Sequence, residues 1–435
     1  MRTSTLPIPE GHARALGFVL LSLLCAPGLV HAHGAPPRAL CPLLADAAGV
    51  SLVQLSSGLA QRHEQGYVFL CPALWGGDEV APSASFDDER AVVAARNGLF
   101  WVDTLGPPHA STIALAGVPL ALAKASDGLY VLTAEAGSSS LQRIAAASEP
   151  VWSATAGQLA QTSWLALDAS DAQLLLVGTR DQIVEQLLLD HAGNLVSHAT
   201  APWPSAVLSV QAHLTEQGPY LTLATDDGQL TLARFEQDGI HALRRAAASL
   251  AGPVQSASGA LLVAIDGALF TLELGVLTQL AASAPITGLS RLGGASYASV
   301  HSGLCLVDRD GCSRQVFDFA QLTAPDLTNA SDSARAACLA EWQHLQVDLS
   351  AAGLLPADVA VDAGASVAGH AADAGDAELA ATPAHVGDTT PDAGGAPPRA
   401  GSGGCAVAPR GLASPWLVCL ALWWGRSRRR RRSAR

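Results

Sequence analysis

A short phrase recurs along the chain, consisting of a tight turn centred on Gly or Asp and then five to seven residues of largely apolar, alternating character. Five copies are clear, and they read NGLFWVD at 97–103, DGLYVLT at 127–133, DGQLTLARF at 227–235, DGALFTLEL at 266–274 and SGLCLVD at 302–308. Two weaker copies are SSGLAQR at 56–62 and TRDQIVEQLLL at 179–189, where Asp181 stands in the Gly position. Glycine accepts a positive φ without a Cβ clash, and Asn-Gly and Asp-Gly pairs suit hairpin turns. Each copy therefore predicts a turn that leads into a strand.

The spacing of these turns indicates the architecture. The turn positions are Gly58, Gly98, Gly128, Asp181, Gly228, Gly267 and Gly303, with separations of 40, 30, 53, 47, 39 and 36 residues. A four-stranded blade with its turns takes about 40 to 45 residues. The stretch from Asp46 to Phe319 holds 274 residues, which divided by seven gives about 39 for each copy. We therefore predict an all-β fold, a seven-bladed β-propeller, within residues 33–330.

Apolar runs precede several of these phrases and supply the strands before the turns. They are AVVAA at 91–95, QLLLVG at 173–178, YLTLAT at 220–225 and ALLVAI at 260–265. Continuous apolar strands suit sheets that are covered on both faces, as a blade is by its two neighbours. The aromatic residues expected to fill the space between blades are Trp75, Trp101, Trp152, Trp164 and Trp203. A ligand-facing position is the alternative for Trp75, which lies beside GGDE at 76–79.

The N-terminus has the three parts of a secretory signal. Arg2 and Arg14 give a charged start, residues 15–25 form an apolar run, and Val30-His31-Ala32 provides a small-residue exit. This order predicts a signal peptide over residues 1–32 with cleavage after Ala32. We therefore expect the protein to be exported.

The cysteines gain significance from this export, because disulfides are the default in an oxidising compartment. Cys25 leaves with the signal and Cys419 lies in the terminal apolar stretch, so the disulfide candidates of the body are Cys41, Cys71, Cys305, Cys312 and Cys338. Cys405 stands apart from them. A Cys41–Cys71 bridge would close about 30 residues at the start of the ring. Cys305 and Cys312 would lie opposite each other across a four-residue loop at 307–310, but not across a two-residue turn centred on Asp310-Gly311, and Cys312–Cys338 is the rival pairing.

After Phe319 the sequence changes character twice. Residues 331–353 place Ala334, Cys338, Leu339, Trp342 and Leu345 at helical spacing, with Ser331 or Asp332 as N-cap. This pattern predicts one amphipathic helix packed on the ring. Residues 354–404 are rich in Ala, Gly, Asp and Pro and hold no aromatic residue. Such a segment buries too little apolar surface to offset the entropy of ordering, so we expect a disordered linker.

The formal charge of −13 is unevenly distributed. Residues 1–32 and 405–435 hold 10 of the 25 basic residues and 1 of the 38 acidic ones, which leaves 15 basic and 37 acidic residues, or −22, in residues 33–404. A body this acidic repels phosphate backbones, so nucleic acid is not expected as a partner.

The last 31 residues combine Cys405 after small residues, an apolar run at 412–424 and seven Arg between Arg426 and Arg435. Thirteen residues span about 20 Å as a helix, less than the roughly 30 Å of a bilayer core. The Arg cluster should hold this end in the cytoplasm. The segment resembles the myxobacterial C-terminal sorting signal. That resemblance implies removal of the tail at Cys405, a lipid on Cys405 and display at the cell surface, by way of the cytoplasmic membrane.

Chemical motifs are not apparent. The 13 His form no H-x-x-x-H or H-E-x-x-H pair, and the sequence holds no G-x-S-x-G, P-loop or G-x-G-x-x-G motif, so no catalytic residue, metal or cofactor is predicted. The turn phrases, ending in DRDGCS at 308–313, resemble in degenerate form the Asp-box repeats of sialidase-type propellers or the repeats of WD-type propellers. This resemblance implies the fold but no site residue.

Three functions are compatible with these observations. The first is an exported, surface-anchored, non-catalytic propeller that binds a protein or glycan of the cell envelope. The second is a hydrolase or lyase with an active site at the central channel. The third is a scaffold for an envelope complex that is contacted through the C-terminal helix.

Overall fold

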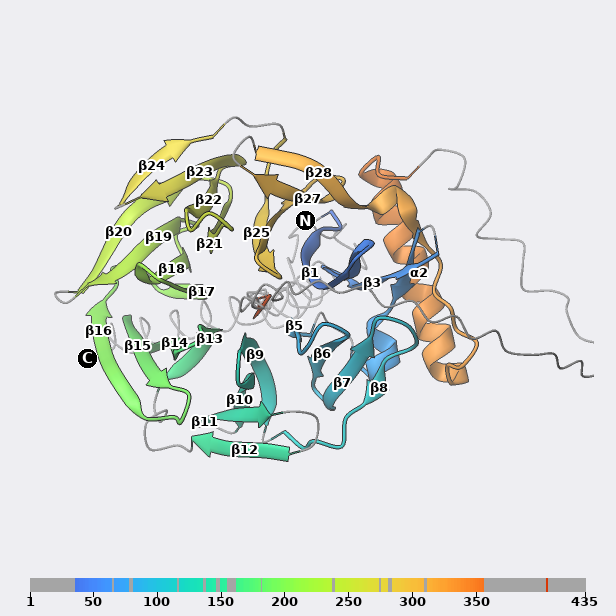
Figure 1. The fold of residues 1–435 in the computed structure, drawn as a ribbon, viewed down its shortest axis with the longest axis horizontal. Coiled ribbons are helices and arrows are strands. Elements are labelled where there is room, and N and C mark those ends of the chain that lie inside the picture. Colours follow the sequence, from blue (N-terminus) through green and yellow to red (C-terminus); the bar gives the residue numbers. More distant parts are fainter. Residues whose placement is uncertain are drawn as a thin grey trace, which may run out of the picture.

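The computed structural model describes residues 36–355 and 404–405, with gaps at 65, 78–80, 116, 136–137, 146–148, 155–161, 181, 237–238, 274, 281–283 and 309–310. The predicted signal peptide with Ala32, nearly all of the predicted linker and residues 406–435 lie outside the described residues. The described helix α2 and the strands from β1 to β30 are numbered as in Figure 1.

Seven antiparallel sheets stand around a central axis, which confirms the predicted seven-bladed propeller (Figure 1). Each blade uses four consecutive strands, and the first of them lies innermost. Blade 1 comprises β1 (Ala39–Asp46), β2 (Gly49–Leu55), β3 (Gly58–His63) and β4 (Gly66–Leu70). Blade 2 comprises β5 (Ser83–Ser85), β6 (Arg90–Ala95), β7 (Gly98–Asp103) and β8 (His109–Ala110). Blade 3 comprises β9 (Val118–Ala125), β10 (Gly128–Glu135), β11 (Ser138–Ala145) and β12 (Glu149–Ala154).

The remaining four blades repeat this pattern. Blade 4 comprises β13 (Ser163–Ala169), β14 (Gln173–Arg180), β15 (Ile183–Asp190) and β16 (Leu195–Pro202). Blade 5 comprises β17 (Val207–Thr215), β18 (Gly218–Thr225), β19 (Leu230–Glu236) and β20 (Gly239–Ala246). Blade 6 comprises β21 (Leu250–Gln255), β22 (Leu261–Ile265), β23 (Ala268–Glu273) and β24 (Val276–Gln279). Blade 7 comprises β25 (Gly288–Leu292), β26 (Ala295–Val300), β27 (Gly303–Asp308) and β28 (Gly311–Asp318).

The recurring sequence phrase occurs once in every blade. In six blades it forms the turn into the third strand, whereas in blade 3 it precedes the second strand, β10. This one displacement explains the irregular separations of 30 and 53 residues on either side of Gly128. The two add up to 83 residues, which is about two ordinary blades.

Gly58 shows why the turn position excludes a side chain. Its φ is +152°, and a Cβ at this position would lie 2.5 Å from the carbonyl oxygen of Leu70 and 2.8 Å from the Phe69 ring. The third strand starts directly under the fourth, so only glycine permits this close approach.

The core consists of seven apolar clusters, and each cluster joins two neighbouring blades. Strand β22 contributes to two of them. Leu262 and Ala264 pack toward blade 7, while Leu261, Val263 and Ile265 pack toward blade 5. Side chains alternate across a strand, so an entirely apolar strand covers both neighbours at once. The ring is therefore stabilised by contacts between sheets, and each apolar cluster of the described residues lies between two blades.

The ring closes between blades 1 and 7. Strand β29 (Leu322–Thr323) follows the 3₁₀ turn η2 (Phe319–Gln321) and pairs parallel with the outer edge of β4. The hydroxyl of Tyr67 lies 2.8 Å from the Val50 carbonyl and 3.1 Å from the Val316 carbonyl of blade 7, and the Ser299 hydroxyl donates to the Leu40 carbonyl at 3.1 Å. The Val50 contact lies within blade 1, whereas the contacts of Val316 and Ser299 cross the seam where the two ends of the propeller meet.

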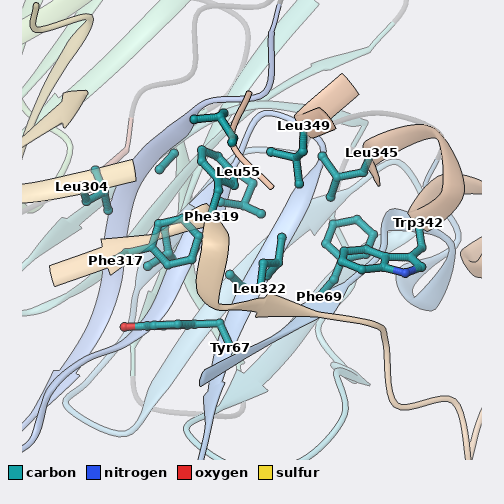
Figure 2. Packing of buried hydrophobic residues seen from close by; sticks show 14 of the residues in the cluster. Leu55, Tyr67, Phe69, Leu304, Phe317, Phe319, Leu322, Trp342, Leu345 and Leu349 are labelled. Carbon is teal, nitrogen blue, oxygen red and sulfur yellow. The ribbon is translucent and has the colours of Figure 1, made fainter. Parts of the chain in front are cut away.

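Helix α2 (Asp332–Ala351) packs beside this seam. Ser331 is its N-cap and accepts a hydrogen bond from the Ala334 N–H. The buried residues of the helix are Cys338, Trp342, Leu345 and Leu349, which pack with Phe69, Phe317 and Phe319 (Figure 2). Leu339, expected on the packed face, is 42% exposed because Cys338 takes that direction one residue earlier.

Tryptophans fill the space between blades where their side chains are described. Trp75, Trp101 and Trp164 are buried, and Trp203 is partly buried against blade 5. Trp75 lies in the 3₁₀ turn η1 (Pro72–Trp75) and packs between blades 1 and 2 at 2% exposure. The ligand-facing alternative for Trp75 is therefore wrong. The side chain of Trp152 lies outside the described residues.

Candidate functional site

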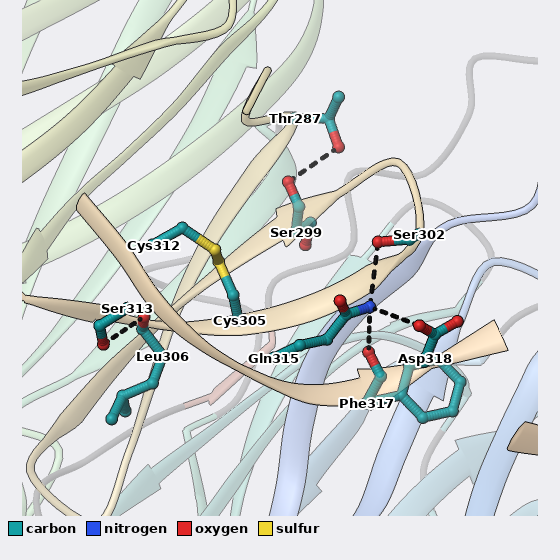
Figure 3. Close-up of a disulfide and its surroundings, with 10 residues drawn as sticks. All are labelled: Thr287, Ser299, Ser302, Cys305, Leu306, Cys312, Ser313, Gln315, Phe317 and Asp318. Carbon is teal, nitrogen blue, oxygen red and sulfur yellow. Dashed lines mark hydrogen bonds between the residues drawn. A yellow bond between two sulfur atoms is a disulfide. The ribbon is translucent and has the colours of Figure 1, made fainter. Parts of the chain in front are cut away.

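A disulfide joins Cys305 on β27 to Cys312 on β28, with Cα atoms 5.7 Å apart (Figure 3). The predicted four-residue loop is wrong, because the strands continue to Asp308 and resume at Gly311. Cys312 lies opposite Val307 and bonds diagonally to Cys305, and the register shifts between Leu304 and Cys305 and again between Leu306 and Val307. The irregular hairpin thus brings together two cysteines that do not face each other.

A second disulfide joins Cys71 to Cys338 of helix α2. The expected Cys41–Cys71 pair and the rival Cys312–Cys338 pair are therefore wrong. Cys71 directly follows the outermost strand of blade 1, so it faces α2, whereas Cys41 lies on the innermost strand. Cys41 is itself disulfide-bonded.

A cavity of about 260 Å³ opens at the seam between blades 1 and 7. The β1–β2 turn, the β3–β4 turn and the middle of β28 line it, which places Arg62, Glu64, Tyr67 and Arg314 around one space. Arg62 and Arg314 are far apart in sequence and meet only because the ring closes here. The cavity lies at one end of the ring, among blade 1 hairpins.

The two arginines of this seam cavity differ in their partners. Arg62 forms an ion pair with Asp46 and approaches the Val50 carbonyl at 3.5 Å. Burial opposes ionisation of Asp46, but the Ala48 N–H and the Arg62 guanidinium together hold the pKa of its carboxyl below its usual value. Arg314 is exposed, and its guanidinium makes no hydrogen bond or ion pair with the residues that the structure describes. Arg314 is therefore the donor available to a ligand.

Gln315 holds the neighbouring backbone of β28 in place. Its side-chain amide nitrogen contacts the Ser302 hydroxyl at 3.0 Å, the Phe317 carbonyl at 3.3 Å and Asp318 at 3.0 Å (Figure 3). These contacts fix β28 to the β26–β27 turn. The strand that presents Arg314 is consequently restrained by its neighbours.

A second polar group links blades 3 and 4. Asp127 accepts the Tyr130 hydroxyl at 3.0 Å and lies 3.1 Å from His191 Nδ1 and 3.4 Å from Arg143 Nε. His191 Nε2 lies 2.9 Å from the Ser170 carbonyl. Burial and the adjacent carboxylate raise the pKa of the Tyr130 hydroxyl well above its usual value. Both nitrogens of His191 are engaged and Tyr130 stays protonated, so this group joins blades and offers neither a general base nor a nucleophile.

Two further ionisable groups lie on the innermost strands of blades 4 and 5. Burial raises the pKa of the Asp168 carboxyl to about 7, although the backbone N–H groups of Leu214 and Ala169 donate to it at 2.6 and 2.9 Å. Burial lowers the pKa of His213 to about 4. Its Nε2 has no hydrogen-bond partner in the described part of the chain. Neither group lines the seam cavity.

Other chemical groupings are sparse in the part of the chain that the structure describes. Within the described ranges, no three His, Cys, Asp or Glu side chains are grouped so that they could hold a metal ion. No described helix is long and apolar enough to span a membrane, and the predicted span at 412–424 is outside those residues. Cys405 is described in its backbone only, as part of β30 (Gly404–Cys405).

Sequence reasoning did not identify the seam cavity. Arg62 and Arg314 carry no local motif, and no spacing rule relates them. The available signal was indirect, since a ring must place its first and last blades side by side.

The fold and its seam define a class: a seven-bladed β-propeller whose closure is reinforced by a C-terminal helix and a disulfide. No protein-family model and no curated protein matches the sequence. Among solved structures the chain is similar to the Dos1 propeller, with a TM-score of 0.42 and 10% identity over 67% of this chain and 95% of that one. It is also similar to the β-propeller domain of Cps50 (Swd1) from Myceliophteria thermophila, with a TM-score of 0.36 and 12% identity over 62% and 95% of the two chains. The assignment of the fold rests on the seven sheets themselves.

Proposed function

We propose that this protein is an exported, surface-anchored, non-catalytic propeller that binds a protein or glycan ligand at the cell envelope. The observation that carries the proposal is the seam cavity with Arg314. An arginine with free donors recognises a carboxylate through two parallel hydrogen bonds, and it also donates to hydroxyl groups. The ligand class that fits is therefore an acidic glycan or a peptide with an exposed carboxylate.

The surrounding charge makes this arginine selective. The body of the protein carries a net charge of −22 over residues 33–404, which disfavours polyanions at most of its surface. A single carboxylate can enter at Arg314, while a long anionic polymer would meet repulsion from the rest of the ring. A short or sparsely charged ligand is thus favoured over nucleic acid.

A binding screen with a matched variant tests the proposal. The purified mature protein is applied to arrays of surface glycans, with and without uronic acids, and of envelope proteins. We expect at least one retained ligand, and we expect Arg314→Gln to weaken its binding about tenfold or more, the value of one lost charge-assisted contact. Arg245→Gln is the control, because Arg245 is also exposed but lies on β20 of blade 5. It should leave the affinity unchanged.

Two outcomes would overturn this proposal. An array on which nothing is retained removes the binding function. A ligand bound equally by wild type and Arg314→Gln removes the seam cavity as its site. Chemical conversion of a retained ligand by the wild-type protein would support the hydrolase or lyase instead.

The proposal includes attachment to the envelope through the C-terminal segment. The order of Cys405, apolar run and Arg cluster supports a route through the cytoplasmic membrane, with the body outside. Surface proteolysis of whole cells tests this topology. Digestion of the propeller without cell lysis is expected, and full protection of the propeller until lysis would contradict it.

A second function, as a scaffold of an envelope complex, is favoured by one feature of helix α2. Leu339 and Val347 lie two turns apart on the helix and are 42% and 56% exposed. A photo-crosslinking residue at Val347 should capture one defined envelope protein if the helix is a contact. The same photo-crosslinking residue placed at Gln343, which is also exposed on this helix, tests whether the contact is confined to the face of Val347. Equal, unspecific labelling from both positions would exclude a defined scaffold contact.

A further inference from the structure

Strand β30 (Gly404–Cys405) lies in the central channel of the ring. It pairs antiparallel with the innermost strand of blade 2, with Gly404 opposite Ala84 and Cys405 opposite Ser83. Its Cα atoms also come within 8 Å of β1, β9 and β25, the innermost strands of blades 1, 3 and 7. Figure 1 shows it as the short red strand at the centre of the ring. Residues from the far end of the chain thus occupy the channel.

Blade 2 has the shortest innermost strand of the seven blades. Its innermost strand, β5, has three residues, whereas the innermost strands of the other six blades have five to nine. A short inner strand leaves part of the channel wall without backbone partners. The added strand β30 supplies such partners to β5.

The pairing of the cysteines links strand β30 to blade 1. The chain has eight cysteines, and Cys71–Cys338 and Cys305–Cys312 account for four of them. Cys41 is disulfide-bonded, so its partner is Cys25, Cys405 or Cys419. Of these three, Cys405 is the one in the described residues, and its strand lies beside β1, the strand that carries Cys41. We infer that Cys405 is the partner of Cys41 and that this bridge fixes the C-terminal segment in the channel.

The bridge requires an oxidant, which an envelope supplies as the disulfide of a thiol–disulfide oxidoreductase. The thiolate of one cysteine attacks that disulfide and forms a mixed disulfide. The thiolate of the other then attacks the mixed disulfide and releases the enzyme as a dithiol. Two S–H bonds of the substrate are lost, one S–S bond forms, and the enzyme carries away two electrons and two protons.

The bridge has a consequence for attachment. The Cys405 sulfur cannot carry a lipid while it is bonded to Cys41. In a molecule with this bridge, the apolar run that follows Cys405 would therefore contact the membrane in place of a lipid. Even if the chain were cleaved next to Cys405, the disulfide to Cys41 would keep Cys405 attached to the propeller.

Peptide mapping without reduction tests this inference directly. Trypsin cleaves after Arg38 and Arg62 and releases residues 39–62, in which Cys41 is the one cysteine. It cleaves after Arg399 and Arg410 and releases residues 400–410, in which Cys405 is the one cysteine. Cys25 and Cys419 fall in other peptides. Membrane-extracted protein, alkylated before digestion, should yield 39–62 joined to 400–410, and reduction should separate the two.

A variant pair strengthens the test. In Cys405→Ser the thiol of Cys41 should become alkylated by maleimide in denaturant, with one adduct on residues 39–62, whereas the wild type should gain none on that peptide. Cys419→Ser is the control and should leave Cys41 unreactive. Recovery of residues 400–410 with a lipid or a free thiol on Cys405, or of Cys41 joined to another peptide, would overturn the inference.

Discussion

Cys71 and Cys338 are joined by a disulfide across 267 residues of sequence, with their Cα atoms 5.5 Å apart. Both residues are fully buried, in the cluster where blade 1, blade 7 and helix α2 meet. The bridge therefore closes blades 2 to 7 into one covalent loop. A ring made of separate sheets can open at one place, the seam between its first and last blades, and the bridge lies there.

Removal of this bridge should cost more stability than removal of the Cys305–Cys312 bridge. On the chain-entropy model, a loop of this length contributes about 5 kcal/mol, and the loop of 7 between Cys305 and Cys312 contributes about 2 kcal/mol. We expect Cys71→Ala/Cys338→Ala to lower the urea midpoint more than Cys305→Ala/Cys312→Ala does. Urea unfolding followed by tryptophan fluorescence measures both. A larger loss in the second variant would show that ring closure does not limit stability.

Gly58 and Gly98 form a natural pair for testing the turn of the repeat. Both begin the third strand of a blade with positive φ, at +152° and +133°. A Cβ at Gly58 meets the Leu70 carbonyl, while a Cβ at Gly98 meets no atom within 4 Å. We expect Gly98→Ala to cost about 1 kcal/mol for backbone strain, and Gly58→Ala about 3 kcal/mol because steric overlap adds to it. Thermal unfolding compares them, and equal losses would mean that φ alone selects glycine.

The repeat was predictable because its determinants are local. A turn glycine and an alternating strand are visible in any window of ten residues, so blade number followed from counting them. The exception in blade 3 was not visible, because Gly128 carries the same local signal before the second strand as Gly98 does before the third. Only pairing between strands distinguishes the two.

The seam was not predictable in the same way. Ring closure brings Cys71 to Cys338, and it separately places Arg62 and Arg314 around one cavity. Closure depends on the angles between all seven sheets, which together must make a full circle. No local sequence pattern specifies the total of these angles. The expected Cys41–Cys71 bridge followed sequence proximity, but strands at opposite edges of blade 1 separate those two residues.

Trp342 should account for most of the attachment of helix α2. Its ring lies 5.7 Å from that of Phe69 and it is 8% exposed, whereas Leu339 on the same helix is 42% exposed. We expect Trp342→Ala to destabilise the protein by about 3 to 5 kcal/mol, the usual cost of deleting a buried aromatic side chain. Leu339→Ala should change stability by less than about 0.5 kcal/mol. Chemical denaturation of both variants provides the comparison, and similar values would show that α2 contributes little packing.

Asp168 and His213 should give the protein two pH dependences of opposite sign. The folded-state pKa of Asp168, about 7, exceeds its unfolded value of 3.8, so its contribution to stability falls as pH rises from about 4 through about 7. The folded-state pKa of His213, about 4, is below its unfolded value of 6.5, so its contribution falls as pH drops from about 6.5 toward 4. In the wild type the two slopes largely offset each other between these limits.

Single variants should reveal each slope. The readout is the unfolding free energy at pH 7 minus the unfolding free energy at pH 4.5. Asp168→Asn should increase this difference relative to the wild type by up to about 3 kcal/mol, and His213→Gln should decrease it by up to a similar amount. The double variant should return near the wild-type value if the two groups titrate independently. A single variant that leaves this difference at the wild-type value would mean that the group it removes keeps its ordinary pKa in the folded protein, and that the innermost strand carrying that group is better hydrated than its burial implies.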